Sequence, residues 1–303
     1  MTSVLVFGSI NKDTIVSIAR APRLGETLLG RSVMTAPGGK GANQAVAAAR
    51  LGANVRMFGA VGIDADGDMM LATLSHEGVD VSCVARVRTE TGSAILTVTD
   101  DGENSIIVIP GANRQVGAGQ IEQLGSSVRP GDIVVAQLEV PLDEVVAALE
   151  TAQNRNAHTI LNAAPAQDIA RLLPLVDILV VNESEAALLW GAPVDSVDDA
   201  RLAAAHCVND YAVVAVITLG SSGLVIADAN SIDHVPAHAV KAVDSTGAGD
   251  TFVGALAAFL AEGMSLRDAA GLASRAGAVA CTALGAQASM PMRASLDTTQ
   301  VPA

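Results

Sequence analysis

The segment Asp244-Ser245-Thr246-Gly247-Ala248-Gly249-Asp250 is a polar, glycine-rich turn that ends in a carboxylate. It leads directly into Thr251-Phe252-Val253-Gly254-Ala255-Leu256, and the apolar run continues to Ala261, which predicts a buried helix over about 248–261. The first N–H groups of a helix have no intrahelical partner, and small residues let an anion approach them closely. The segment therefore predicts an anion site at which Asp250 orients a hydroxyl against a phosphate. An ordinary helix cap is the alternative interpretation of these residues alone.

A second glycine-rich helix start lies far upstream, in Ala36-Pro37-Gly38-Gly39-Lys40-Gly41-Ala42-Asn43-Gln44-Ala45. It is not a P-loop, and it is not a dinucleotide fingerprint, because Gln44 occupies the position of the last glycine in that pattern. It offers accessible backbone, one cation and a carboxamide, which suits a small molecule with several hydroxyl groups. A helix entry without a ligand is the alternative for this segment alone.

Composition bounds the class of protein. The 303 residues can bury a full core as one large α/β domain or two small ones, and with 2% aromatics that core must be built from Ala, Val, Leu and Ile. The net charge of −14 argues against nucleic-acid binding through a basic face. No apolar run reaches the roughly 18 residues of a membrane span, and the first residues predict a strand rather than a signal peptide. Three widely spaced cysteines form no zinc or disulfide pattern, so we expect the reducing cytoplasm.

Short apolar segments alternate with alanine-rich helical segments along most of the chain. This alternation predicts a mostly parallel sheet covered by helices on both faces. The predicted strands are 4–10, 54–60, 133–137, 159–162, 178–181, 213–218, 224–227 and 231–235. The predicted helices are 40–51, 66–77, 142–153, 183–190, 197–208, 248–261 and 266–282.

Two segments, about 13–36 and 92–110, break the alternation. The first has no helical period, and the second alternates apolar and polar residues around the turn Asp100-Asp101-Gly102-Glu103. Both predict half-exposed antiparallel strands that pair into a small sheet and cover a site at the carboxyl ends of the main strands. We therefore predict a single α/β/α domain over 1–303 with a small β-sheet lid.

Polar side chains follow two of the predicted central strands. Asn11 and Asp13 come just after the first strand, in Gly8-Ser9-Ile10-Asn11-Lys12-Asp13, and Glu139 ends another in Gln137-Leu138-Glu139. A carboxylate buried at such a strand end is costly unless it meets a polar partner. These residues favour a polar ligand, with a solvated turn as the alternative for Asn11 and Asp13.

The upstream segment, followed by Gly52 and Gly62, resembles the N-terminal signature of the ribokinase-like (PfkB) sugar kinases. The segment 244–256 resembles their C-terminal signature. The resemblance extends over essentially the whole chain, from Gly8-Ser9-Ile10-Asn11 to Gly285-Ala286-Gln287. It is nearest to the ribose-phosphorylating members, through Gln137-Leu138-Glu139 and Leu161-Asn162-Ala163-Ala164-Pro165-Ala166.

The resemblance implies a kinase that transfers a phosphoryl group in line from ATP to the primary hydroxyl of D-ribose, giving D-ribose 5-phosphate. Asp250 would be the base, and the amides of Gly247, Ala248 and Gly249 the anion hole. The implied sugar-binding residues are Asn11, Asp13, Gly39, Lys40, Asn43, Glu139 and Asp250. The implied nucleotide-binding residues are Asn182, Glu185, Thr218, Leu219, Gly220, Ser221, Ser222, Gly223, Gly249 and Ser274, where Ser274 replaces the Asn or His that is common in the family. A monovalent-cation loop would use Asp244, Thr246, Ala280, Ala283, Gly285 and Ser289.

The resemblance further implies Mg²⁺ or another divalent cation, K⁺ as activator, and a homodimer that pairs through the lid. No nucleic-acid or membrane partner is expected. The alternatives are a kinase of the same family for 2-deoxyribose, another pentose, a ketohexose or a nucleoside. A sugar-binding regulator on the same fold is a further alternative, disfavoured because it would not need Asp250 beside its Gly-Ala-Gly turn.

Overall fold

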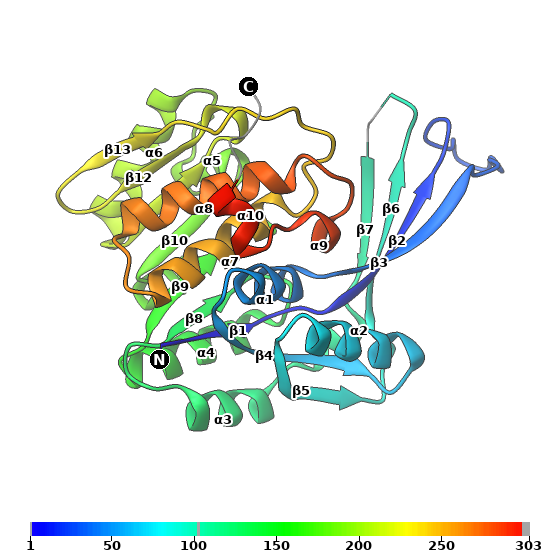
Figure 1. The fold of residues 1–303 in the computed structure, drawn as a ribbon, viewed down its shortest axis with the longest axis horizontal. Coiled ribbons are helices and arrows are strands. Elements are labelled where there is room, and N and C mark those ends of the chain that lie inside the picture. Colours follow the sequence, from blue (N-terminus) through cyan, green and yellow to red (C-terminus); the bar gives the residue numbers. More distant parts are fainter. Residues whose placement is uncertain (1, 102–103, 299–303) are drawn as a thin grey trace.

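Two β-sheets organise the protein, whose computed structural model describes residues 2–101 and 104–298 (Figure 1). The large sheet has the order β13-β12-β11-β10-β9-β8-β1-β4-β5, and β12 runs in the opposite direction to the other strands. The small sheet has the order β3-β2-β6-β7. The predicted α/β fold, with a mostly parallel central sheet and a second small sheet, is confirmed.

The central strands form from short apolar, β-branched segments that are buried on both faces, as is usual in parallel sheets. The strand predicted over 4–10 ends earlier, at Phe7, because the following residues leave the sheet toward the small one. An edge strand over 80–87 was not predicted. The strands of the large sheet are β1 Ser3–Phe7, β4 Asn54–Gly62, β5 Asp80–Val87, β8 Ile133–Ala136, β9 His158–Asn162, β10 Ile178–Asn182, β11 Val214–Thr218, β12 Leu224–Ala227 and β13 Ile232–Val235.

Helices cover both faces of the large sheet and bury an alanine-rich core on each side. On one face lie α1 (Lys40–Arg50), α2 (Ala65–His76), α7 (Ala248–Ala261) and α8 (Leu266–Ala280). On the other lie α3 (Ala118–Ser127), α4 (Leu142–Asn154), α5 (Glu183–Trp190) and α6 (Val197–Tyr211). Two short helices, α9 (Ala286–Ser289) and α10 (Arg293–Thr298), follow α8. Among the described residues, no helix has the length and hydrophobicity required to cross a bilayer.

The order of the strands has a topological switch point between β1 and β8. From β1 the chain first extends the sheet through β4 and β5, and it later returns to place β8, β9, β10 and β11 on the opposite side. Connections therefore leave β1 and β8 in opposite directions, and ligands of open α/β sheets bind at such a point, outside the carboxyl ends of the strands. The predicted sugar-binding residues lie just after these two strands: Asn11 and Asp13 follow β1, and Glu139 follows β8.

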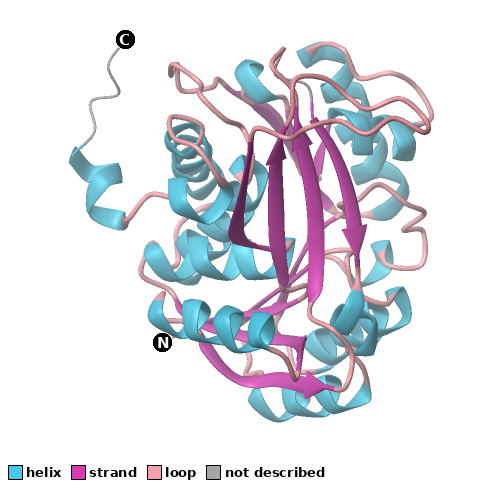
Figure 2. Cartoon of the chain, turned by 90° about the vertical axis from the view of Figure 1, so that its right-hand side faces the viewer, coloured by secondary structure: helices cyan, strands magenta, loops and turns pink. Residues whose placement is uncertain are grey.

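The small sheet begins beside this switch point, since β2 follows β1 directly. It consists of β2 (Asn11–Ser17), β3 (Ser32–Gly38), β6 (Gly92–Val98) and β7 (Asn104–Ile109), so both of the irregular segments contribute strands. Gly102 and Glu103 of the predicted turn lie outside the described residues. Figure 2 looks onto one face of the sheet, which no helix covers. Because side chains alternate along a strand, Asn11, Asp13 and Ile15 share one face of β2.

Candidate active site

The predicted anion site is the start of α7. Gly247 is the N-cap, with φ of 77°, and a Cβ there would approach Ala286 to 2.9 Å, so both the backbone conformation and the packing require glycine. The N–H of Ala248 donates to the Ser245 carbonyl at 3.1 Å. Among the described residues, the N–H groups of Gly249 and Asp250 have no partner in the preceding turn. An anion at this helix start would therefore rely mainly on those two donors.

The side chain of Asp250 lies at the edge of this helix start and is only 8% exposed. Its Oδ2 accepts a hydrogen bond from Asn43 Nδ2 at 2.9 Å, and its Oδ1 accepts one from Gln44 Nε2 at 3.0 Å. Both donors belong to α1. The glycine-rich turn upstream and the turn at 244–250 are thus brought into direct contact at the carboxylate.

A second carboxylate, Glu139, is held at the start of α1. Its Oε2 accepts from the Ser9 hydroxyl at 2.6 Å and from the Lys40 N–H at 3.1 Å. Lys40 is the cation among these acidic groups. Burial alone would lower the pKa of its ammonium group, but the negative charges of Asp250, Glu139 and Glu185 outweigh burial and raise it. Lys40 is therefore charged and balances part of the negative charge.

Asp13 projects from β2 toward the same carboxylates. Burial, followed by the charges of Glu139 and Asp250, raises its pKa to about 7. Its Oδ1 is buried and makes no hydrogen bond within the described part of the chain. A Cβ at Gly38 would lie 2.1 Å from Asp13 Oδ2, so a larger residue there would displace this side chain. An unpartnered buried oxygen of this kind fits a ligand that donates a hydroxyl hydrogen.

Asn11, the other predicted sugar-binding residue on β2, is fixed by Asn113, which the sequence analysis missed. Asn113 is 1% exposed; its Nδ2 donates to Asn11 Oδ1 at 2.7 Å and its Oδ1 accepts from the Ile10 N–H at 2.9 Å. This hydrogen bond occupies Asn11 Oδ1, so Asn11 Nδ2 can donate to a ligand. A Cβ at Gly92 would lie 2.2 Å from Asn113 Nδ2 and 2.4 Å from Asn11 Oδ1, so the start of β6 packs against both side chains without free space.

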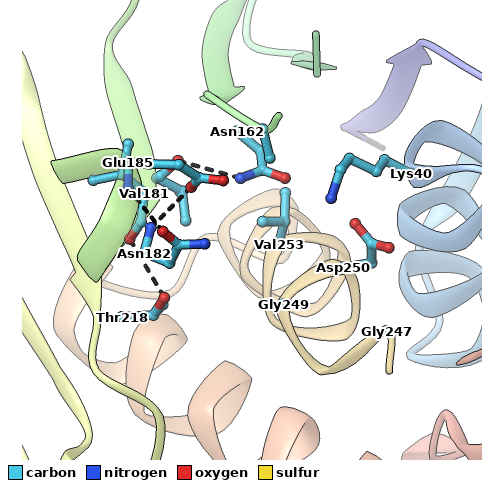
Figure 3. A pocket seen from close by; sticks show the side chains of 12 residues that line it. Lys40, Asn162, Val181, Asn182, Glu185, Thr218, Gly247, Gly249, Asp250 and Val253 are labelled. Atoms are coloured by element: carbon cyan, nitrogen blue, oxygen red, sulfur yellow. Dashed lines mark hydrogen bonds between the residues drawn. The ribbon is translucent and has the colours of Figure 1, made fainter. Parts of the chain in front are cut away.

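Two adjoining cavities surround the start of α7. The smaller has a volume of about 130 Å³. In Figure 3, Lys40 and Asp250 face it from one side, and Asn182, Glu185 and Thr218 lie on the other. The larger has a volume of about 590 Å³ and a mainly apolar lining. Both cavities are lined by Thr218 and Gly249, so a ligand in the larger one can extend toward Asp250.

Most of the predicted nucleotide-binding residues line the larger cavity. It is lined by Thr218, Gly220, Ser221, Gly223, Gly249 and Ser274. Leu219 and Ser222 do not line it: the Leu219 side chain is buried, and the Ser222 carbonyl accepts from His234. Residues that the sequence analysis missed include Phe252 of α7 and the segment 237–240, which adds mostly small apolar side chains. Such a lining suits the flat, apolar faces of a purine base.

Asn182 and Glu185 form a capping box at the start of α5. Glu185 Oε2 accepts from the Asn182 N–H and Asn182 Oδ1 accepts from the Glu185 N–H, each at 2.9 Å. Burial raises the pKa of Glu185. A divalent cation bound with a nucleotide would favour the charged form, and oxygen ligands of this kind suit Mg²⁺. In the described residues, no group of three or more His, Cys, Asp or Glu is arranged as a metal cage.

The predicted cation loop brings two segments together through Asp244. Its Oδ1 accepts from the N–H and the hydroxyl of Thr246, and its Oδ2 accepts from the Gly285 N–H at 2.9 Å. These hydrogen bonds lower the pKa of Asp244 although burial alone would raise it. Ser289 donates its hydroxyl to the Ala286 carbonyl. Ala280 is buried at the end of α8, and Ala283 lies on the exposed turn after it.

A network of buried carboxamides lies behind the carboxylate of Asp250. Gln44 also donates to Asn162 and accepts from Gln137, and Gln287 Nε2 donates to Asn43 Oδ1 at 3.0 Å. Apart from Asn43, none of these was predicted as a site residue. They belong to separate parts of the chain, and no local spacing signals that they meet.

Comparisons with known proteins identify the family of the chain. The family model described as pfkB family carbohydrate kinase matches residues 1–293. A ribokinase of Haemophilus influenzae is 38% identical over 294 residues, covering 96% of each chain, and a deoxyribokinase of Salmonella typhi is 35% identical, covering 95% of each. The structure of Arabidopsis thaliana ribokinase complexed with ribose and ATP has a TM-score of 0.89 and 31% identity, covering 98% of each chain.

Proposed function

The chain belongs to the pfkB family of carbohydrate kinases, and from this we propose that it is an ATP-dependent kinase that converts D-ribose to D-ribose 5-phosphate. The observation that carries the proposal is the position of Asp250. It lies at a helix N-terminus in the small cavity, beside Lys40, and that cavity adjoins the larger apolar one. The small cavity, which Asn182 and Glu185 also line, would hold the transferred phosphoryl group, and the larger one would hold the rest of the nucleotide. The sugar would lie on the other side of Asp250, at the residues of 11–13 and at Glu139.

Catalysis by these residues would consist mainly of positioning and charge stabilisation. Asp250 accepts the proton of the primary hydroxyl as its oxygen attacks the γ-phosphorus and the bond to the ADP oxygen breaks. The N–H groups of Gly249 and Asp250, with that of Gly247, would stabilise the charge on the transferred phosphoryl group. The N–H of Ala248, also expected in this role, is already donated to the Ser245 carbonyl. Fixed donors in such roles are worth roughly 3–4 kcal/mol each. Asn11, Asp13, Lys40, Asn43 and Glu139, with the backbone of Gly39, would hold the sugar.

The cofactor proposals follow from the polar edges of the two cavities. Glu185 and Asn182 would hold Mg²⁺ together with the triphosphate, and the metal would neutralise phosphate charge. We place K⁺ between the 244–246 and 280–289 segments, which Asp244 holds together. Most of its ligands would be backbone carbonyls, so the absence of a side-chain metal cage in the described residues is no obstacle.

We also propose that two copies pair through the small sheet. In the described part of the chain this sheet exposes apolar side chains on both faces, among them Val33, Met34, Ile106 and Ile107, whose exposed fractions are between 55% and 67%. Such a surface is unusual for a monomer.

The free thiols of Cys83, Cys207 and Cys281 suit a reducing compartment, and we assign the enzyme to the cytoplasm.

Turnover tests the function directly. Purified protein with ATP, Mg²⁺, K⁺ and D-ribose should release ADP, and the product should be D-ribose 5-phosphate. 2-Deoxyribose is the second candidate, because the deoxyribokinase relative covers the same length of chain. The unpartnered oxygen of Asp13 favours the fully hydroxylated sugar, so kcat/KM should be higher for D-ribose than for 2-deoxyribose. Good turnover of another sugar without turnover of D-ribose would reject the proposal.

A further inference from the structure

We propose that Gln44, itself oriented by Gln137, is a positioning residue that holds the carboxylate of Asp250 in the direction needed to accept the hydroxyl proton. The inference rests on the proposed phosphoryl transfer. Both glutamines are fully buried, and neither lines the cavity beside Asp250. They therefore act through Asp250 and not on a substrate.

The carboxylate of Asp250 is held from one side by consecutive residues of α1. Asn43 and Gln44 each donate to a different oxygen, at 2.9 and 3.0 Å. Consecutive helical residues point about 100° apart, so two such donors reach one carboxylate only if the helices lie close together. They do: a Cβ at Gly254 of α7 would lie 2.3 Å from the Gln44 carbonyl oxygen. The two donors fix the plane of the carboxylate, and its remaining acceptor positions face the cavity.

The charge on Asp250 determines the direction of the amides behind it. An ionised carboxylate only accepts hydrogen bonds, so Gln44 must present its Nε2 to it. The other hydrogen of that Nε2 is donated to Asn162 Oδ1 at 3.0 Å. Gln44 Oε1 then faces Gln137, whose Nε2 donates at 2.6 Å. Reversing the amide of Gln44 or of Gln137 would place two oxygen atoms against each other.

The arrangement is unfavourable for stability alone. Gln137 Oε1 is buried against Gly8, where a Cβ would lie 1.9 Å away, and makes no hydrogen bond within the described residues. An unpaired buried carbonyl oxygen costs free energy, whereas apolar side chains of similar size at both positions would avoid that cost. The orientation of Gln137 is kept although it leaves this atom unpaired. Its hydrogen bond to Gln44 is therefore what determines the orientation.

The test is a double-mutant cycle on kcat with Gln44→Met and Asp250→Asn. Gln44→Met keeps the length of the side chain and removes the donor. We expect kcat to fall about tenfold to a hundredfold, as for a small displacement of a reacting group, with KM for D-ribose and ATP nearly unchanged. In the Asp250→Asn background the same substitution should have almost no further effect, because Gln44 acts only through that carboxylate. Gln137→Met should show the same non-additivity with a smaller loss.

Gln120→Met is the matched control. Gln120 is also buried, but its Oε1 accepts from the Gly117 N–H at the start of α3, on the opposite face of the large sheet. It should lower the melting temperature without changing kcat. If Gln44→Met does not fold, the cycle with Gln137→Met takes its place. A wild-type kcat in the folded variant, or equal losses in both backgrounds, would overturn the inference. Absence of sugar turnover in the wild-type enzyme would instead reject the proposed function.

Discussion

The sugar-binding role that we propose for Asp13 predicts that sugar binding depends on pH near neutrality. Burial and the charges of Glu139 and Asp250 raise its pKa to about 7, so protons compete with sugar hydroxyls for its oxygens. KM for D-ribose should rise as the pH falls from about 8 to about 6, by at most about tenfold per unit. Asp13→Asn should have a high KM that no longer varies over this range. Steady-state kinetics at saturating ATP measure both, and a flat wild-type KM would contradict the role given to Asp13.

Asp250 is the residue whose loss should affect the chemical step most. Asp250→Asn keeps the shape of the side chain and removes the proton acceptor, so kcat should fall at least about a hundredfold, the usual size of a general-base effect. Binding of ATP, measured by calorimetry, should change little because the larger cavity is formed mainly by other residues. Near-wild-type turnover would remove Asp250 from the base role.

The residues of the site could be predicted unequally. Lys40, Asn43 and Asp250 stand in glycine-rich helix starts, and the structure places them around the small cavity or in contact with one another. Gln137 and Asn113 carry no such local signal. Their partners are more than ninety residues away in the sequence, so their roles follow only from the order of the strands.

At the level of elements, the contact between α1 and α7 positions the side chain of Asp250. Gly254 allows this approach, because a Cβ would lie 2.3 Å from the Gln44 carbonyl oxygen and 2.7 Å from Ala47 Cβ. Gly254→Ala should lower the free energy of unfolding by about 1–3 kcal/mol and also reduce kcat. Gly271→Ala in α8, where a Cβ would meet nothing within 4 Å, is the control and should raise stability by about 0.5–1 kcal/mol. Urea unfolding compares the two, and equal effects would contradict the packing argument.

Elements with strong periodicity were predicted well, and those without it were missed. The helices α5 and α7 begin and end where the alanine-rich apolar patterns predict. In α3 the only large apolar residues are Ile121 and Leu124, and two glycines weaken its helix propensity. The strand β5 lies at the edge of the sheet and is half-exposed, so it lacks the continuous apolar run of a central parallel strand. Both are recognisable only from the folded sheet, since β5 forms its edge and α3 packs on one of its faces.

In the whole molecule, a short turn after β1 leads from the large sheet into the small one at the site. β1 of the large sheet ends at Phe7, and β2 of the small sheet begins at Asn11. The sugar-binding residues that we propose on β2 therefore belong to the small sheet, whereas Asp250 and Lys40 belong to helices packed on the large one. A sugar bound between them would join the two sheets. Movement of the small sheet would open the site to water, and closure would exclude it.

The exposed apolar surface of the small sheet predicts a dimer, and two substitutions can show which face of this sheet forms the contact. Ile106 and Ile107 are adjacent on β7 and point to opposite faces, and their exposed fractions are 55% and 63%. Only one face should be covered in a pair related by a two-fold axis. Ile106→Lys and Ile107→Lys should therefore differ: one should give monomers in analytical ultracentrifugation, and the other should remain dimeric. The variant that dissociates should also have a higher KM for D-ribose, because the freed sheet closes less well over the sugar. A monomeric wild-type protein at micromolar concentration, or two dimeric variants, would contradict pairing through this sheet.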